Sequence, residues 1–134
     1  MALEQEPDLT GIRVLVVDDD DDARLLLEKL LVTQGAEVKA VPSARAALDI
    51  LGKERVDVLL SDIEMPGTDG YQLIQELRLR SPQEGGSVPA AALTAYARTE
   101  DRLRALRAGF QLHLAKPVQP SELVTVVFSL ARRN

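Results

Sequence analysis

The stretch VLVVDD at residues 14–19 is an apolar run that stops at two acids. Two later apolar runs end in the same way, VDVLL at 56–60 before Ser61-Asp62 and LHL at 112–114 before Ala115-Lys116. In an open parallel sheet the carboxyl ends of all strands lie along one edge. We therefore predict that these acids and the lysine, far apart in sequence, meet in one shallow cleft.

Short apolar runs alternate with amphipathic segments along the rest of the chain. Five apolar runs predict strands, at residues 12–17, 37–41, 56–61, 89–94 and 110–115. Helical spacing predicts five helices, whose caps or first residues are Asp20, Ser43, Asp69, Thr99 and Pro120. Three glycines are expected to end helices, namely Gly35, Gly52 and Gly109. The run at 89–94 is ambiguous, because its alanines favour a helix and only its position argues for a strand.

Strict alternation of strand and helix predicts an α/β fold with one parallel sheet of five strands and helices on both of its faces. The usual five-strand solution is the flavodoxin-like order 2-1-3-4-5, which makes the first and third strands neighbours. The helices are expected to turn Leu26, Leu103 and Leu106 inward, among others. The length of 134 residues fits one domain at 9–134, preceded by a polar tail or linker remnant at 1–8.

Composition limits the possible partners. A net charge of −5 disfavours direct nucleic-acid binding, since attraction to phosphates supplies most of that affinity. Without cysteine, neither a disulfide framework nor a thiolate metal site can form. No apolar stretch approaches the roughly 20 residues of a membrane helix, and the acidic N-terminus lacks the basic start of a signal peptide. We expect a soluble, cytoplasmic domain that does not touch a membrane directly.

The acids at the strand ends form a candidate metal site. Carboxylates of Asp18, Asp19 and Asp62 placed together would repel one another by a few kcal/mol per pair at an effective dielectric constant near 20. Mg²⁺, which takes carboxylate oxygens, water and phosphate, would neutralise them. A carboxylate beside Mg²⁺ and a lysine is a competent nucleophile toward phosphorus. The remaining acids of the run, Asp20, Asp21 and Asp22, fit a solvated helix N-terminus.

Three further polar residues lie near the predicted edge. Lys116 would by default be a surface lysine, but a cis bond to Pro117 would aim its ammonium group into the cleft. Thr94 is either a plain strand residue or a hydroxyl that bonds a phosphoryl oxygen after transfer. His113 fits an exposed side chain of an edge strand better than a phosphohistidine carrier, since no acid or base adjoins it. The arginines at 98–107 fit a solvated helix face or, alternatively, a partner surface.

Four motifs carry a family resemblance: VLVVDD at 14–19, LLSDIEMPGTDG at 59–70, ALTA at 92–95 and AKP at 115–117. Together they resemble the receiver domain of response regulators in two-component signalling. The stretch at 93–123 is also similar to receivers attached to hybrid histidine kinases.

The resemblance implies a role for each matching residue. Asp62 would accept a phosphoryl group from the phosphohistidine of a histidine kinase or phosphotransfer domain. Mg²⁺ would lie on Asp19, Asp62 and the backbone carbonyl of Glu64, with Asp18 helping through water. Lys116 would pair with the phosphoryl oxygens, and Thr94 and the Ala95 amide would bind them after transfer.

The resemblance also implies how the signal leaves the domain. Thr94 would couple to position 113, where members of the family commonly carry an aromatic residue and this chain has the smaller, titratable His113. Glu64 and Tyr96 occupy positions that influence phosphate lifetime. The responding surface would be the last two helices and the strand between them, acting through a partner, a homodimer or a parent chain. The domain would promote its own phosphorylation and dephosphorylation and would not be an enzyme in the usual sense.

Two alternatives remain open on the sequence. A Mg²⁺-dependent phosphatase of the haloacid dehalogenase type would use Asp18 as nucleophile and Asp20 as acid. It is disfavoured because Asp22 replaces the usual small residue, the late acidic pair is missing and there is no cap domain. A receiver that serves only as a docking module is the other alternative, against which the intact acids and Lys116 argue.

Overall fold

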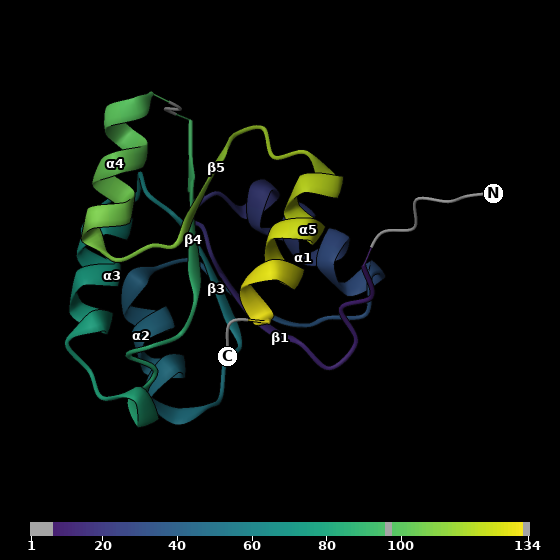
Figure 1. Cartoon of the computed structure of the whole chain (residues 1–134), viewed down its shortest axis with the longest axis horizontal. Helices are drawn as coiled ribbons and strands as arrows, with labels where there is room; N and C mark the ends of the chain where they lie inside the picture. The colour runs from purple at the N-terminus through teal and green to yellow at the C-terminus, as the bar shows by residue number, and fades with distance from the viewer. Residues whose placement is uncertain (1–6, 96–97, 133–134) are drawn as a thin grey trace.

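The computed structural model describes residues 7–95 and 98–132, which form one parallel sheet between two layers of helices (Figure 1). The strands are β1 (Arg13–Val17), β2 (Glu37–Val41), β3 (Val58–Asp62), β4 (Ala90–Thr94) and β5 (Leu112–Ala115). The helices are α1 (Asp21–Thr33), α2 (Ala44–Lys53), α3 (Gly70–Arg78), α4 (Thr99–Ala108) and α5 (Pro120–Ala131), with a 3₁₀ turn at Pro82–Glu84. Most of the predicted tail at 1–8, and Tyr96, lie outside these ranges.

The sheet has the order β2-β1-β3-β4-β5 with all neighbours parallel, as predicted. Helices α1 and α5 cover one face, and α2, α3 and α4 cover the other (Figure 1). The ambiguous segment at 89–94 is a strand whose five residues are all buried. Its alanines lie in the middle of the sheet, where small side chains fit under both helix layers, and this packing outweighs their helix propensity.

The predicted caps are confirmed at three helix starts. Asp20 accepts hydrogen bonds from the amides of Asp22 and Ala23, and Ser43 accepts one from Ala46. At α3 the Asp69 and Gln72 side chains each bond the other's backbone amide, which forms a capping box. These side chains satisfy helix amides that have no partner within the helix, so each helix begins where the sequence predicts.

Some predicted boundaries are wrong by a few residues. Gly52 lies inside α2, which runs on to Lys53 and is capped by Glu54 in an extended conformation. The third strand begins at Val58, two residues later than predicted, and the Asp57 side chain just before it accepts a hydrogen bond from the Arg13 amide at 2.8 Å.

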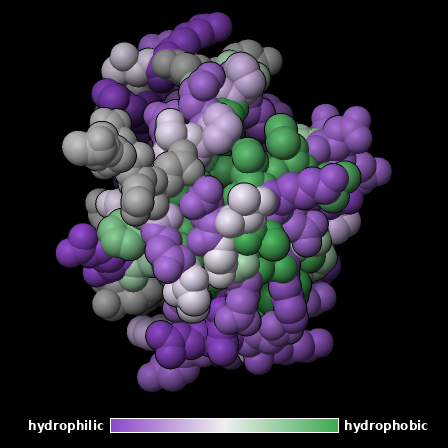
Figure 2. Space-filling model, turned by 90° about the vertical axis from the view of Figure 1, so that its right-hand side faces the viewer, coloured by the Kyte–Doolittle hydropathy of each residue, from purple (hydrophilic) through white to green (hydrophobic). Residues whose placement is uncertain are grey.

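Three leucines predicted to face inward are exposed. Leu26 of α1 is 58% exposed, and Leu103 and Leu106 of α4 are 39% and 43% exposed. Helix α1 buries a narrow stripe, Leu27 and Leu31, one turn apart, while α4 buries Ala105. Figure 2, which looks at the side carrying α1 and α5, shows apolar side chains gathered on that face. No helix in the described ranges has the length and apolar character needed to span a bilayer.

Arg78 at the end of α3 connects two loops, the one before β4 and the one before β5. Its guanidinium group donates hydrogen bonds to the carbonyls of Gly109 and Gly86, both at 3.0 Å, and to Gln111 Oε1 at 3.1 Å. The same Gln111 oxygen accepts the Ala90 amide at 2.7 Å at the start of β4. Burial lowers the pKa of Arg78. The half-buried arginine thus joins α3, β4 and the loop before β5.

Replacing Arg78 with methionine is expected to lower the free energy of unfolding by about 2–4 kcal/mol, because buried carbonyls lose charged donors. Urea unfolding would measure the loss. Arg102, an exposed arginine of α4, provides the matched control, and Arg102→Met should change stability by less than about 0.5 kcal/mol. Equal stability of Arg78→Met and the wild-type chain would contradict the role assigned to Arg78.

Candidate functional site

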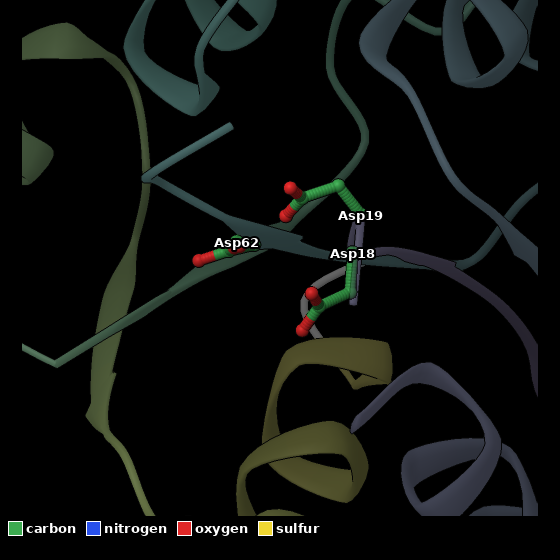
Figure 3. Close-up of side chains that lie close together, drawn as sticks. All are labelled: Asp18, Asp19 and Asp62. Atoms are coloured by element: carbon green, nitrogen blue, oxygen red, sulfur yellow. The ribbon is translucent and has the colours of Figure 1, made fainter. Parts of the chain in front are cut away.

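Three carboxylates meet at the carboxyl edge of the sheet, as predicted. Val17 of β1 pairs with Ser61 of β3, which places Asp18 and Asp62 side by side just beyond this pair. Asp18, Asp19 and Asp62 each offer a carboxylate oxygen within 4.8 Å of the others (Figure 3). Asp18 and Asp62 are buried, whereas Asp19 is exposed. The cluster is therefore open to water through Asp19.

Asp18 is held from several directions. Its Oδ1 accepts the Asp20 amide at 2.9 Å, and its Oδ2 lies 3.3 Å from Lys116 Nζ. The Asp18 carbonyl accepts a hydrogen bond from Arg24 at 2.8 Å, and Arg24 also pairs with Asp21. The Asp20 amide and Lys116 thus orient the carboxylate.

Lys116 enters the site from the end of β5. Its Nζ lies 3.1 Å from Asp62 Oδ1 and 3.3 Å from Asp18 Oδ2. The Lys116–Pro117 bond is cis, the geometry for which the sequence predicts an ammonium group in the cleft. Burial lowers the pKa of Lys116, but the carboxylates of Asp62 and Asp18 outweigh it and the pKa lies above its usual value. The lysine is therefore a fixed cation facing two acids.

Asp62 is 3% exposed, and its burial disfavours the ionised form of the carboxyl group. Its contact with Lys116 is an ion pair that lacks hydrogen-bond geometry, so Asp62 Oδ1 has no hydrogen-bond partner within the described residues. Burial raises the pKa of Asp62 to about 6; Asp18 and Glu64 add to the rise, and Lys116 opposes it. The buried carboxylate thus has one oxygen without a hydrogen bond, and Lys116 only partly offsets the cost of its charge.

The donor set fits a hard divalent cation. Asp18, Asp19 and Asp62 contribute oxygen atoms only, which Mg²⁺ prefers to nitrogen or sulfur. Oδ1 of Asp62, which is paired with Lys116 but has no hydrogen-bond partner in this part of the chain, is one candidate ligand atom. Asp19 leaves the cluster accessible to water, which Mg²⁺ usually retains when bound.

The side-chain contacts of Glu64 are a part of the site that sequence reasoning missed. The resemblance implies a metal-binding role for its backbone carbonyl and an influence of this position on phosphate lifetime, but it does not indicate that the carboxylate contacts the two groups predicted to bind phosphoryl oxygens. The Thr94 hydroxyl donates to Glu64 Oε2 at 2.9 Å, and the Ala95 amide donates to Oε1 at 3.4 Å. The available signal was position, because Glu64 follows Asp62 by two residues at the same sheet edge.

His113 differs from its predicted environment. It was expected to be an exposed side chain on an edge strand, but it is half-buried, and its Nε2 is buried without a hydrogen-bond partner in the described part of the chain. The reason lies in the register. His113 pairs with Ala92, whose side chain belongs to the core beneath α2, α3 and α4, so His113 faces the α4 layer although β5 is at the edge.

Comparisons with known proteins agree on one family. Residues 14–128 match the family model of the response regulator receiver domain. A 14.6 kDa protein of Leptolyngbya boryana is 49% identical over 119 residues, which are 89% of each chain. The sensor protein GacS of Pseudomonas syringae is 38% identical over 126 residues. The receiver domain of the sensor histidine kinase PA1611 of Pseudomonas aeruginosa superposes with a TM-score of 0.83 and 32% identity, covering 92% of this chain and 99% of that one.

One of these similarities bears on the site, and another shows how much of a longer protein the chain matches. The PA1611 receiver crystal has a magnesium ion coordinated in its active-site cleft. The match to GacS covers 91% of this chain but 14% of that sensor, so the sensor's other activities belong to parts of it that this chain does not match. The phosphatase of the haloacid dehalogenase type finds no support in the comparisons.

The raised pKa of Asp62 predicts a pH-dependent stability. Because the folded pKa of about 6 exceeds the ordinary value of 3.8, the folded state pays a cost that is complete above about pH 6 and disappears below about pH 4. Without divalent cations, Asp62→Asn should raise the free energy of unfolding by about 2–3 kcal/mol near pH 7.5, and by less than half of that near pH 4.5. Urea unfolding at both pH values would measure this difference.

Asp49, exposed on α2, is the matched control for that measurement. Asp49→Asn should leave stability nearly unchanged at both pH values. A gain for Asp62→Asn that persists undiminished in acid would contradict the assigned cause.

Proposed function

Because the chain belongs to the response regulator receiver domain family of two-component signalling, we propose that Asp62 accepts a phosphoryl group from the phosphohistidine of a histidine kinase or phosphotransfer domain. The observation that carries this assignment is the state of Asp62 Oδ1. It is a buried carboxylate oxygen without a hydrogen bond, with Lys116 Nζ 3.1 Å away and the acids Asp18 and Asp19 beside it.

The proposed transfer is a substitution at phosphorus. A carboxylate oxygen of Asp62 forms the new P–O bond while the P–N bond to the donor imidazole breaks, and the imidazole nitrogen keeps the electron pair. The Lys116 ammonium group lies where negative charge gathers on the phosphoryl oxygens, and it lowers the repulsion between two anionic groups. Phosphoryl transfer requires mainly positioning and charge stabilisation, and the pre-formed ion pairs supply both.

Asp18, Asp19, Asp62 and the Glu64 carbonyl are the residues we expect to hold Mg²⁺. When bound, the ion would screen both the acids and the phosphoryl oxygens. Asp18 is already fixed by the Asp20 amide and Lys116, so the chain itself organises one side of the metal site.

The Thr94 hydroxyl and the Ala95 amide are the proposed donors to the bound phosphoryl oxygens. Both lie at the end of β4, beside Asp62 in the register of the sheet. The same residues would serve hydrolysis of the aspartyl phosphate, so the domain promotes changes in its own phosphorylation and does not turn over a separate substrate.

The phosphodonor is expected to approach from the side of α1. Leu25 and Leu26 in the first turns of this helix are 48% and 58% exposed, and they follow directly after the acidic cluster. Figure 2 shows the apolar character of that face. This surface supports docking of another protein next to Asp62.

The output surface is proposed to be α4, β5 and α5, where Thr94 and His113 would link the phosphoryl site to the exterior. This surface would bind a partner protein, a second copy of the chain or another part of a longer chain, in each case in the cytoplasm.

Incubation with Mg²⁺ and acetyl phosphate should add one phosphoryl group to the wild-type chain and to the control Asp49→Asn, and none to Asp62→Asn. Intact-mass spectrometry would detect the addition. Equal labelling of Asp62→Asn would remove the assignment, and loss of labelling in Asp18→Asn alone would identify Asp18 as the nucleophile.

Asp19→Asn should weaken Mg²⁺ binding by about tenfold or more, because the cluster loses an ionised oxygen ligand. Isothermal titration calorimetry would measure the dissociation constant. Asp22→Asn removes the same charge from an exposed position in the same acidic run and should change binding far less. Equal weakening by both variants would show that general charge, not ligation, governs the affinity.

A further inference from the structure

The two donors proposed for the phosphoryl oxygens already hold an anion. The Glu64 carboxylate takes the Thr94 hydroxyl on Oε2 at 2.9 Å and the Ala95 amide on Oε1 at 3.4 Å. One planar group with two oxygens thus spans two adjacent donors. A phosphoryl group bound to Asp62 would need the same hydrogen atoms for two of its own oxygens.

Burial does not force Glu64 into this position. Glu64 is an exposed residue, whereas Thr94 is 2% exposed, so the glutamate could extend into water and the threonine could not. Its carboxylate instead lies near the carboxylate of Asp62. It contributes to the raised pKa of Asp62, after burial and Asp18. The hydrogen bonds to Thr94 and Ala95 must offset this repulsion, which marks the pair of donors as an anion-binding site.

We propose that Glu64 is an internal occupant of the phosphoryl-oxygen site, and that the incoming phosphoryl group must displace its carboxylate from Thr94 and Ala95. This inference rests on the proposed function of Asp62. It makes Glu64 a residue that sets how tightly the site holds a phosphoryl group.

A displaced Glu64 carboxylate would move into a neighbouring cleft. Glu64 and Thr94 line a cleft of about 480 Å³ between the β3–α3 loop and α4, together with Tyr71 and Arg104. The Arg104 guanidinium group lies 3.9 Å from the centre of the Tyr71 ring. A carboxylate released from Thr94 would therefore enter an open cleft whose lining includes the cation Arg104 and the acids Asp69 and Asp101.

The occupant also fixes Thr94 before any phosphoryl group arrives. A threonine side chain that turns toward the site only after phosphorylation would change rotamer during the reaction. Here Thr94 already points toward the site, where Glu64 accepts its hydroxyl. The phosphoryl group then exchanges for a like-charged group on donors that are already in position.

The first test measures the affinity for beryllofluoride, a phosphoryl analogue, at saturating Mg²⁺ by isothermal titration calorimetry. Glu64→Ala should bind it about tenfold more tightly than the wild-type chain, since the analogue no longer competes for two donors. Glu64→Gln, which keeps one acceptor oxygen and loses the charge, should fall between them. Glu76→Ala, an exposed glutamate of α3, is the matched control and should bind like the wild-type chain.

The second test follows the Thr94 rotamer by three-bond NMR couplings. In the wild-type chain Thr94 should hold one χ1 rotamer both without and with beryllofluoride. In Glu64→Ala, which removes one acceptor of its hydroxyl, the couplings should differ from those of the wild-type chain, and beryllofluoride should restore the wild-type values. This readout is independent of affinity and of any loss of stability in the variant.

Each outcome decides the matter. Equal affinity of Glu64→Ala and the wild-type chain for beryllofluoride would overturn the inference and leave the role of Asp62 intact. If Glu64→Gln bound beryllofluoride as tightly as Glu64→Ala, the inference would also be overturned, because the charge of Glu64 alone would then explain the effect. An averaged Thr94 in the wild-type chain would overturn it as well. If no form of the chain binds beryllofluoride or takes up acetyl phosphate, the proposed function fails and the inference fails with it.

Discussion

The ion pairs of Lys116 with Asp62 and Asp18 are the interaction on which the site depends. They bring the end of β5 to the ends of β3 and β1, and the parallel order of the sheet is what makes this possible. A single lysine cannot neutralise two buried carboxylates and a neighbouring exposed one, so the cluster keeps an excess of negative charge. The folded chain thereby loses some stability at this edge, and under the proposed function the same excess charge provides affinity for Mg²⁺.

Glu64 adds a negatively charged group to the other side of the same site, where it accepts hydrogen bonds from Thr94 and Ala95. The acids at the strand ends attract a cation, whereas the donors at the end of β4 attract an anion. In the structure the chain satisfies the anion-binding half from its own sequence, through Glu64, and leaves an oxygen of Asp62 unbonded. The two donors at the end of β4 therefore have an acceptor within the chain, whereas one carboxylate oxygen of Asp62 has no hydrogen-bond donor among the described residues.

Much of this architecture can be predicted from the sequence, because it depends on periodicity and on strand ends. The runs before Asp18, Asp62 and Lys116 place these residues correctly, and even the alanine-rich β4 follows from its position in the alternation. The direction in which a side chain points is harder to predict from the sequence. Nothing in the sequence indicates that Glu64 turns toward Thr94 or that His113 is covered, since both depend on how distant elements pack.

Helix α4 shows what shallow packing implies for a signalling domain. Ala105 is its one buried residue, while α2, α3 and α5 each bury at least four. Local unfolding of an element costs roughly in proportion to the apolar surface it hides. The helix next to the cleft of Glu64 and Arg104 is therefore the loosest part of the layer that covers the sheet. Moving α4 therefore exposes less apolar surface than moving α2 or α3, and it leaves the register of the strands beneath it unchanged.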